Sequence, residues 1–206
     1  MNKHVESMRN ALLNYQKTAK ELYAKAEENS RIFKPAEAEK ANEAIYARLK
    51  ESRSAAMAAV NQARENGKAE AEAWGKIDGH KLTPDAELLS AGAVNPSQFK
   101  EMVQKYQDNS TMLQLLKNYA STKNGQDYSG FMAGWGYGGK GAAPSEHYDT
   151  SGIPTVAQKT KQIDSYADSA ADLLTRLGDN GHGFGTGADS PLVVNALEHF
   201  GEDATF

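Results

Sequence analysis

"VESMRNALLNYQKTAKELYAKA", residues 5–26, decides the fold class. Apolar side chains recur in it at alternating steps of three and four residues: Val5, Met8, Leu12, Tyr15, Ala19, Leu22 and Ala26. This spacing places them on one stripe of a helix, at the a and d positions of three heptads. The stretch therefore predicts an amphipathic helix that pairs with another helix and ends before Pro35, since a proline restricts the residue before it.

The stretch from about 35 to 78 predicts a second, longer helix. Its seam continues the same spacing but is mostly alanine: Ile45, Leu49, Ser52, Ala56, Ala59, Ala63, Asn66, Glu70, Ala73 and Ile77. At 1.5 Å per residue the two helices span about 40 and 66 Å, so a hairpin leaves roughly a third of the second helix uncovered. Another helix of the chain or a second copy of the protein must cover that part.

A further helix expected at 154–177 is the favoured cover. Its apolar stripe is formed by Val156, Ile163, Ala167, Ala170, Leu174 and Leu177. Its acidic residues Asp164, Asp168 and Asp172 step by four and match basic residues of the second helix: Arg48, Lys50, Arg53, Arg64 and Lys68. We expect this helix to pack within its own chain.

Residues 82–123 predict a compact module of three short helices. Thr83, Asn95 and either Asn109 or Ser110 are the expected N-caps, with Gln98 completing a capping box. Ten apolar residues form its expected core: Leu88, Leu89, Phe99, Met102, Val103, Tyr106, Met112, Leu115, Leu116 and Tyr119.

Together these patterns predict an all-α protein. The expected segments are a coiled-coil helical hairpin (1–80), the small helical module (81–123), a glycine- and aromatic-rich loop (124–152) and a C-terminal helical segment (153–206). The loop is assigned because eight of the 18 glycines of the chain fall in it without periodicity.

The segment "GWGYGGKGAAPS", 134–145, comes close to a nucleotide-binding loop. Gly134, Gly139 and Lys140 satisfy its first part, but Gly141 stands where Ser or Thr should bind magnesium. A phosphate loop also needs a hydrophobic strand before it and a helix after it. Neither flank has that pattern, so we interpret the segment as an aromatic-rich loop.

Other catalytic and metal signatures are equally weak. "EHYD" (146–149) and "GDNGHGFGTGAD" (178–189) hold metal-capable side chains but lack a two-histidine helical spacing and the terminal glutamate of a calcium loop. There is no cysteine, and the five histidines are scattered. We therefore expect no enzyme activity, no cofactor and no metal site.

Charge and composition bound the partners. The net charge is −4, and residues 124–206 carry 11 acidic against 4 basic side chains. No segment is basic enough to predict nucleic-acid binding. The chain has no run of 18 apolar residues and no signal-peptide pattern at its start, so we expect a soluble protein with no membrane contact.

The aromatic residues of the glycine-rich loop are the candidate protein-interaction site. Tyr128, Phe131, Trp135 and Tyr137 are costly to leave in water, and Trp and Tyr are favoured anchors at interfaces. Trp74, at the end of the second helix, is the fifth candidate.

The run from 71 to 120 carries four short patterns in order, "WGKIDG", "TPDAELL", "FKEMVQKY" and "NSTMLQLL". In this it resembles small helical proteins encoded in the head-assembly gene blocks of phages and prophages of Gram-positive bacteria. The resemblance implies a scaffolding-like virion-assembly or structural accessory role, in the cytoplasm of the infected or lysogenic bacterial host or in the virion.

We accordingly expect a non-enzymatic, self-associating helical protein that binds other phage structural proteins. The alternative is a phage-encoded regulatory or inhibitor protein that binds a host protein through its aromatic loop.

Overall fold

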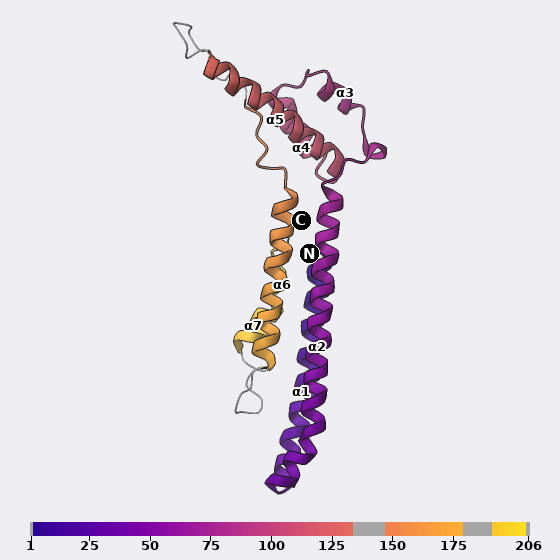
Figure 1. The fold of residues 1–206 in the computed structure, drawn as a ribbon, viewed down its shortest axis with the longest axis vertical. Coiled ribbons are helices and arrows are strands. Elements are labelled where there is room, and N and C mark those ends of the chain that lie inside the picture. The colour runs from indigo at the N-terminus through magenta and orange to yellow at the C-terminus, as the bar shows by residue number, and fades with distance from the viewer. Residues whose placement is uncertain (1, 134–146, 179–190, 205–206) are drawn as a thin grey trace. The chain divides into compact units, whose positions relative to one another are not determined.

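The chain is helical throughout the part that the structure describes. The computed structural model describes residues 2–133, 147–178 and 191–204, and these ranges contain no strand. The helices are α1 (Lys3–Ile32), α2 (Pro35–Trp74), the short 3-10 helix η1 (Gly79–Lys81), α3 (Asp85–Ser90), α4 (Pro96–Lys105), α5 (Ser110–Ala133), α6 (Val156–Gly178) and α7 (Pro191–Glu198) (Figure 1). The predicted all-α class is confirmed.

The chain divides into two compact units. The bundle unit comprises residues 1–69 and 159–206, and the small unit comprises residues 70–158. Both α2 and α6 contribute residues to each unit. Residues from 159 onward therefore belong to the same compact unit as residues 1–69.

The seam predicted for α1 is confirmed. All seven of its residues are buried, with no more than 5% of any of them exposed: Val5, Met8, Leu12, Tyr15, Ala19, Leu22 and Ala26. Asn2 caps the helix, its side chain accepting the His4 backbone N–H at 2.8 Å. The helix ends at Ile32, and the extended backbone of Phe33 leads to the next helix at Pro35, as predicted.

The seam predicted for α2 is buried or half-buried through Ala56, but after it only Ala63 is buried as predicted, and Ile77 lies beyond the end of the helix and is exposed. Ala59, Asn66, Glu70 and Ala73 are exposed, and Val60, Gly67 and Ala71, which follow the first three, are buried instead. The observed seam repeats every eleven residues, through Ala38, Leu49, Val60 and Ala71. Eleven residues make three turns of about 3.67 residues, whereas a heptad assumes 3.5. A strict heptad pattern therefore loses register with the buried face along this helix.

A buried polar contact fixes the pairing of α1 with α2. Asn42 is only 3% exposed, and its side-chain amide donates to the Ala26 carbonyl at 3.2 Å. The same side chain accepts a hydrogen bond from Asn29 Nδ2 at 2.8 Å. Since a buried amide must find partners, a shift of one helix along the other would break both bonds. Asn42 thus selects one register in a seam that is otherwise mostly alanine.

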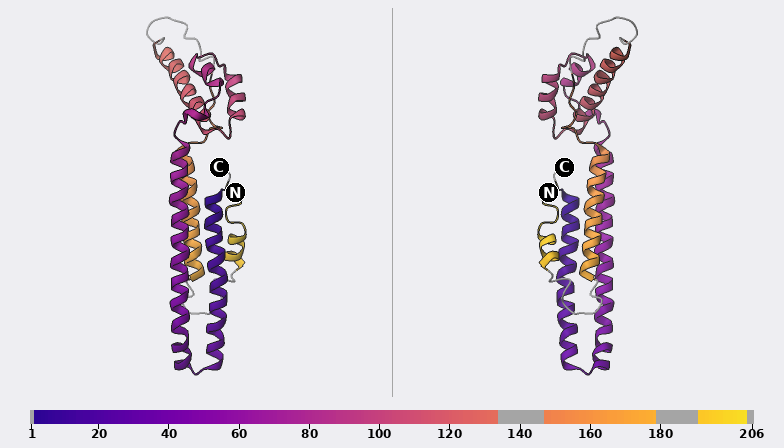
Figure 2. Two further views of the ribbon diagram at one scale, coloured as in Figure 1. Left: turned by 90° about the vertical axis from the view of Figure 1, so that its right-hand side faces the viewer. Right: turned by 90° about the vertical axis from the view of Figure 1, so that its left-hand side faces the viewer.

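In the bundle unit α6 packs against α2, as predicted for residues 154–177 (Figure 2). The predicted stripe is buried from Ile163 through Leu177, with Leu173 in addition. Gly67 allows a close approach, because a Cβ atom there would lie 2.9 Å from Ile163 Cδ1. Asp164 accepts from Arg64 Nε at 2.5 Å and from Lys68 Nζ at 2.9 Å.

Helix α7 joins the bundle unit through both α1 and α6. Arg9 on α1 donates from Nη2 to the Glu198 carbonyl at 2.7 Å. Phe200, just after α7, meets the ring of Tyr166 on α6 edge to face, with 5.9 Å between ring centroids. Leu197 and Phe200 are both buried, so α7 completes the core of this unit.

The small unit forms its own core, largely as predicted. Nine of the ten expected core residues lie in it or pack against it. Leu88 is the exception, because half of it is exposed. Five further residues complete the buried cluster: Val94, Leu113, Ala120, Tyr148 and Ile153.

The helix starts in this unit follow the cap signals with one exception. Asn95 and Gln98 form the predicted capping box of α4, and Asn109 caps α5 by accepting from the Met112 N–H at 3.2 Å. The assignment of Thr83 as a cap is wrong. Its hydroxyl instead donates to Tyr106 Oη at 2.9 Å, and α3 begins at Asp85 without a side-chain cap.

Helix α5 also extends further than expected. It continues to Ala133, so residues 124–133 are helical where the sequence predicted a loop. Gly125 lies inside the helix, where a glycine costs about 1 kcal/mol relative to alanine but does not end it. The glycine-rich stretch that starts at residue 124 is therefore helical as far as Ala133, rather than a loop from its start.

Candidate protein-binding site

A cavity of about 360 Å³ lies in the small unit between α3 and α5. Its wall is mostly apolar. The described residues that line it are Ala86, Leu89, Ser90, Gly92, Leu115, Asn118, Tyr119, Thr122 and Lys123. Pockets that hold small ligands or the anchoring side chains of a partner start at about this size, with an apolar floor and a few polar groups around it.

One edge of the cavity depends on Gly92. Its φ is +68°, a left-handed conformation that side chains other than glycine rarely adopt. The N–H of Gly92 donates to the Leu89 carbonyl, and the N–H of Ala93 donates to the Leu88 carbonyl, both at 3.1 Å. These two bonds form a Schellman motif that closes α3.

Lys123 supplies the positive charge of this edge. Its Nζ lies 5.5 Å from the centroid of the Tyr119 ring, within cation–π range. A Cβ atom at Gly92 would lie 3.4 Å from the same Nζ, so the missing side chain leaves room for the ammonium group. Among the described residues that line the cavity, Lys123 is the one with a charged side chain.

Helix α3 is held in place by a polar cluster at its N-terminus. The Asp85 carboxylate accepts from Lys105 Nζ at 2.7 Å and from Tyr106 Oη at 2.6 Å. These bonds, that of Lys105 foremost, lower the pKa of Asp85 below its usual value. The same contact raises the pKa of Lys105. The cluster is thus charged at neutral pH, and it ties α3 to the end of α4.

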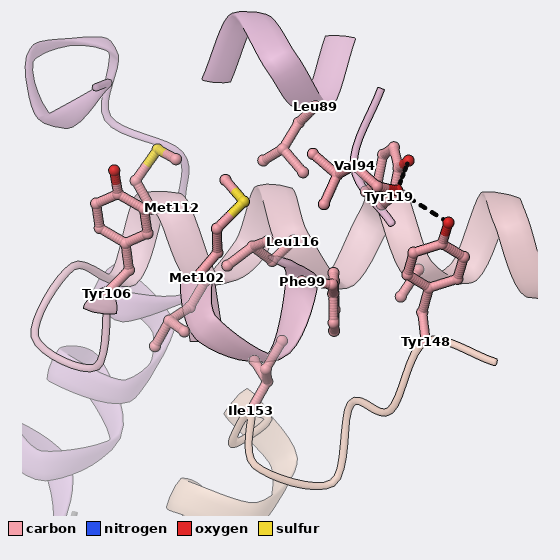
Figure 3. Packing of buried hydrophobic residues seen from close by; sticks show 12 residues of the cluster. Leu89, Val94, Phe99, Met102, Tyr106, Met112, Leu116, Tyr119, Tyr148 and Ile153 are labelled. Atoms are coloured by element: carbon pink, nitrogen blue, oxygen red, sulfur yellow. Dashed lines mark hydrogen bonds between the residues drawn. The ribbon is translucent and has the colours of Figure 1, made fainter. Parts of the chain in front are cut away.

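Tyr119, which lines the cavity, belongs to a cluster of three packed aromatic rings (Figure 3). Phe99, Tyr119 and Tyr148 come from α4, α5 and the segment before α6, and the Tyr148 ring stands edge-on to the other two. The hydroxyls of Tyr119 and Tyr148 both donate to the Val94 carbonyl, at 2.8 and 2.9 Å. Val94 lies just beyond α3, so these bonds hold the α3–α4 connection against α5.

A second contact ties Tyr148 to α5 through its backbone. Asn124 Oδ1 accepts from the Tyr148 N–H and Asn124 Nδ2 donates to the Tyr148 carbonyl, both at 3.1 Å. The Asn124 amide thereby satisfies both the N–H and the carbonyl of Tyr148, as the backbone of a paired strand does in a sheet. One amide side chain therefore ties the backbone at Tyr148 to α5.

The five predicted interaction residues fall in three environments. Trp74 is half-buried and packs against the core of the small unit. Tyr128 and Phe131 belong to α5, of which only the backbone is described at these positions. Trp135 and Tyr137 lie outside the described residues.

The segments that resemble nucleotide-binding or metal-binding motifs form no such site in the residues that the structure describes. The near-miss nucleotide loop at 134–145 lies outside the described residues, as do Asp179, His182 and Asp189. In "EHYD", Tyr148 is buried in the core of the small unit. Asp149 accepts from the backbone and hydroxyl of Ser151, which lowers its pKa. Within the described ranges, no three His, Asp or Glu side chains gather where they could hold a metal.

The cavity between α3 and α5 was not predicted from the sequence. Leu89, Leu115 and Tyr119 were predicted to be core residues; Leu89 and Tyr119 are buried in the core and Leu115 packs against it, but they do not fill the space between their helices. The available signal was the glycine after "ELLSA", which predicts a helix end at Gly92 and hence a short α3. How closely a short helix lies on α5 cannot be read from spacing.

No protein-family model, curated protein or solved structure matches the chain. In the described part of the chain, no helix has the combination of length and apolar character that crossing a membrane requires.

Proposed function

We propose that this protein is a non-enzymatic helical assembly protein that acts by binding proteins, both further copies of itself and other structural proteins of a phage head. The observation that carries the proposal is the apolar cavity between α3 and α5. Large apolar side chains are also exposed in the same unit, at Ile77, Leu82 and Leu88. Exposed large apolar side chains and a preformed apolar cavity in one unit are both features of protein-binding surfaces.

The bundle unit supports the same proposal. Its helices are joined by buried seams, by the Asn42 contacts and by the Arg64–Asp164 ion pair. A folded helical bundle of this kind can serve as a stable scaffold to which the small unit, the proposed binding unit, is covalently joined. The resemblance of residues 71–120 to head-assembly proteins covers much of the small unit, which makes virion proteins the favoured partners.

Co-purification tests the role in assembly. The tagged full chain would be co-expressed with the portal and major capsid proteins of the head-gene block that encodes it. We expect one of them to be retained, and retention of neither would overturn the virion role. A host protein retained by the wild type and lost in Trp135→Ala would favour the host-binding alternative instead.

A matched pair of variants tests the cavity as the binding site. Thr122 and Ser121 are exposed neighbours on α5, and each hydroxyl donates to the carbonyl four residues earlier. Only Thr122 lines the cavity. Thr122→Trp should therefore block the cavity and abolish retention of the virion protein, whereas Ser121→Trp should preserve it. Equal retention by both variants would remove the cavity from the proposal.

A further inference from the structure

Helix α3 has a cavity on one side and an exposed leucine on the other. Ala86 and Ser90 line the cavity. Leu88 is two residues from each of them, which is about 200° around a helix, so it lies on the opposite side of α3. It is 50% exposed, the odd one out among the predicted core residues of this unit.

The charges beside these two features are complementary. Glu87 is exposed and adjacent to Leu88 on α3. The cavity has Lys123 at its edge, with Leu89, Leu115 and Tyr119 forming its apolar wall. A leucine next to a carboxylate is therefore the kind of group that the cavity suits, since it can bury the apolar side chain and pair the charge.

We propose that the cavity binds α3 of a second copy of this chain, with Leu88 inserted in it and Glu87 paired with Lys123. This inference rests on the self-association in the proposed function and specifies its contact. Because the inserted side chain and the cavity lie on opposite sides of α3, one contact leaves a cavity open on one molecule and a leucine exposed on the other. Such a head-to-tail contact extends into a ring or an open chain rather than closing as a twofold dimer.

Sedimentation velocity of the full chain, from micromolar to millimolar concentration, tests the contact. The wild type should grow beyond two molecules as its concentration rises. Leu88→Ala should raise the dissociation constant by about tenfold or more, since a truncated anchor at an interface typically costs at least that. The control Leu13→Ala removes another exposed leucine, on α1 in the bundle unit, and should change nothing.

Two blocked variants test the head-to-tail geometry. Leu88→Ala keeps its cavity but loses its anchor, and Thr122→Trp keeps its anchor but loses its cavity. Each alone should associate about tenfold or more weakly than the wild type, and an equal mixture should stop at a complex of two molecules. Far-UV circular dichroism and melting curves would verify that both variants are folded.

A charge exchange gives an independent test. Glu87→Lys and Lys123→Glu should each weaken association, and the double variant should recover it. A monomeric wild type at all concentrations would overturn self-association and this inference together. A wild type that associates, but does so equally in the Leu88, Thr122 and charge variants, would overturn this inference alone.

Discussion

Arg64 on α2 donates from Nε to Asp164 Oδ1 on α6 at 2.5 Å, and Lys68 Nζ approaches the same oxygen at 2.9 Å. About 70% of each of these three side chains is removed from solvent. One carboxylate thus joins two basic residues one turn apart on α2 to a helix that follows them by about a hundred residues. The contact fixes α6 along the alanine-rich part of α2, where packing alone buries little area per residue.

Asp164→Asn should lower the free energy of unfolding by about 1 kcal/mol, the upper range for partly exposed ion pairs. Asp172→Asn on the same helix is the control. Asp172 pairs with Arg176 one turn away on the same helix, and both side chains are more than half exposed, so its loss should matter much less. Urea denaturation of the two variants compares them, and equal destabilisation would contradict a bridging role for Asp164.

The stabilisation from Asp164 should disappear in acid. Hydrogen bonds from Lys68 and then Arg64 lower the pKa of this carboxyl in the folded protein. A lowered folded-state pKa contributes stability at pH values above the ordinary carboxyl range, about 3.9, and the contribution is lost as the pH falls through the folded value. The difference in unfolding free energy between the wild type and Asp164→Asn should therefore be constant near neutrality and shrink below about pH 4. A difference that grew in acid would contradict this assignment.

Helix α1 shows what could be predicted from the sequence. Its seam mixes large residues with alanine at strict heptad spacing, so the buried face was unambiguous from Val5 to Ala26. In α2, alanines lie on several faces and give no contrast between them. The buried position is Val60 rather than the predicted Ala59, because the helix has more residues per turn than a heptad assumes. The alanine-rich composition gave no sign of this shift. The contact between α2 and α6 was nevertheless predictable, because length left part of α2 uncovered and the aspartates of α6 repeated every four residues.

The candidate site was harder to predict from the sequence than the helix pairing, for a physical reason. Its wall combines residues from α3 and α5, and a cavity is defined by how far apart two helices lie rather than by which side chains they carry. The burial of Tyr148 could not be predicted either, since a tyrosine among polar residues gives no periodic pattern. Its burial depends on Asn124 and Val94, which are 24 and 54 residues away in sequence.

Gly67→Ala should fail to stabilise the protein although alanine is the better helix former. The substitution gains about 1 kcal/mol in helix propensity. At this position, however, the new Cβ would lie 2.9 Å from Ile163 Cδ1 and 3.1 Å from Cγ2, so the Ile163 side chain or α6 itself must shift. In the Ile163→Val background the nearest of these atoms is gone, and the same glycine substitution should be less costly.

Gly125→Ala is the matched control for this effect. Gly125 also lies inside a helix, and a Cβ atom there would meet nothing within 4 Å. It should raise the unfolding free energy by about 1 kcal/mol. Thermal or urea denaturation of the three proteins measures the contrast. A gain at Gly67 equal to that at Gly125 would show that α6 does not lie as close to α2 as the structure places it.

The paired hydroxyls on Val94 make a prediction about non-additivity. Tyr119 and Tyr148 both donate to the buried Val94 carbonyl. Removing one hydroxyl leaves the carbonyl with the other, so Tyr119→Phe or Tyr148→Phe alone should cost about 1 kcal/mol or less. Removing both leaves a buried acceptor without a hydrogen bond, which adds a penalty of about 1–3 kcal/mol.

A double-mutant cycle therefore measures whether one carbonyl serves both tyrosines. We expect the double variant to lose about 1 kcal/mol or more beyond the sum of the single losses. Tyr46→Phe, an exposed tyrosine on α2 that is 43% accessible, controls for the loss of a hydroxyl as such and should leave stability unchanged. Additive losses would mean that the two hydroxyls do not depend on Val94 in common. A coupled loss would support the arrangement in which α5 and the segment before α6 jointly hold the α3–α4 connection, and with it one side of the cavity.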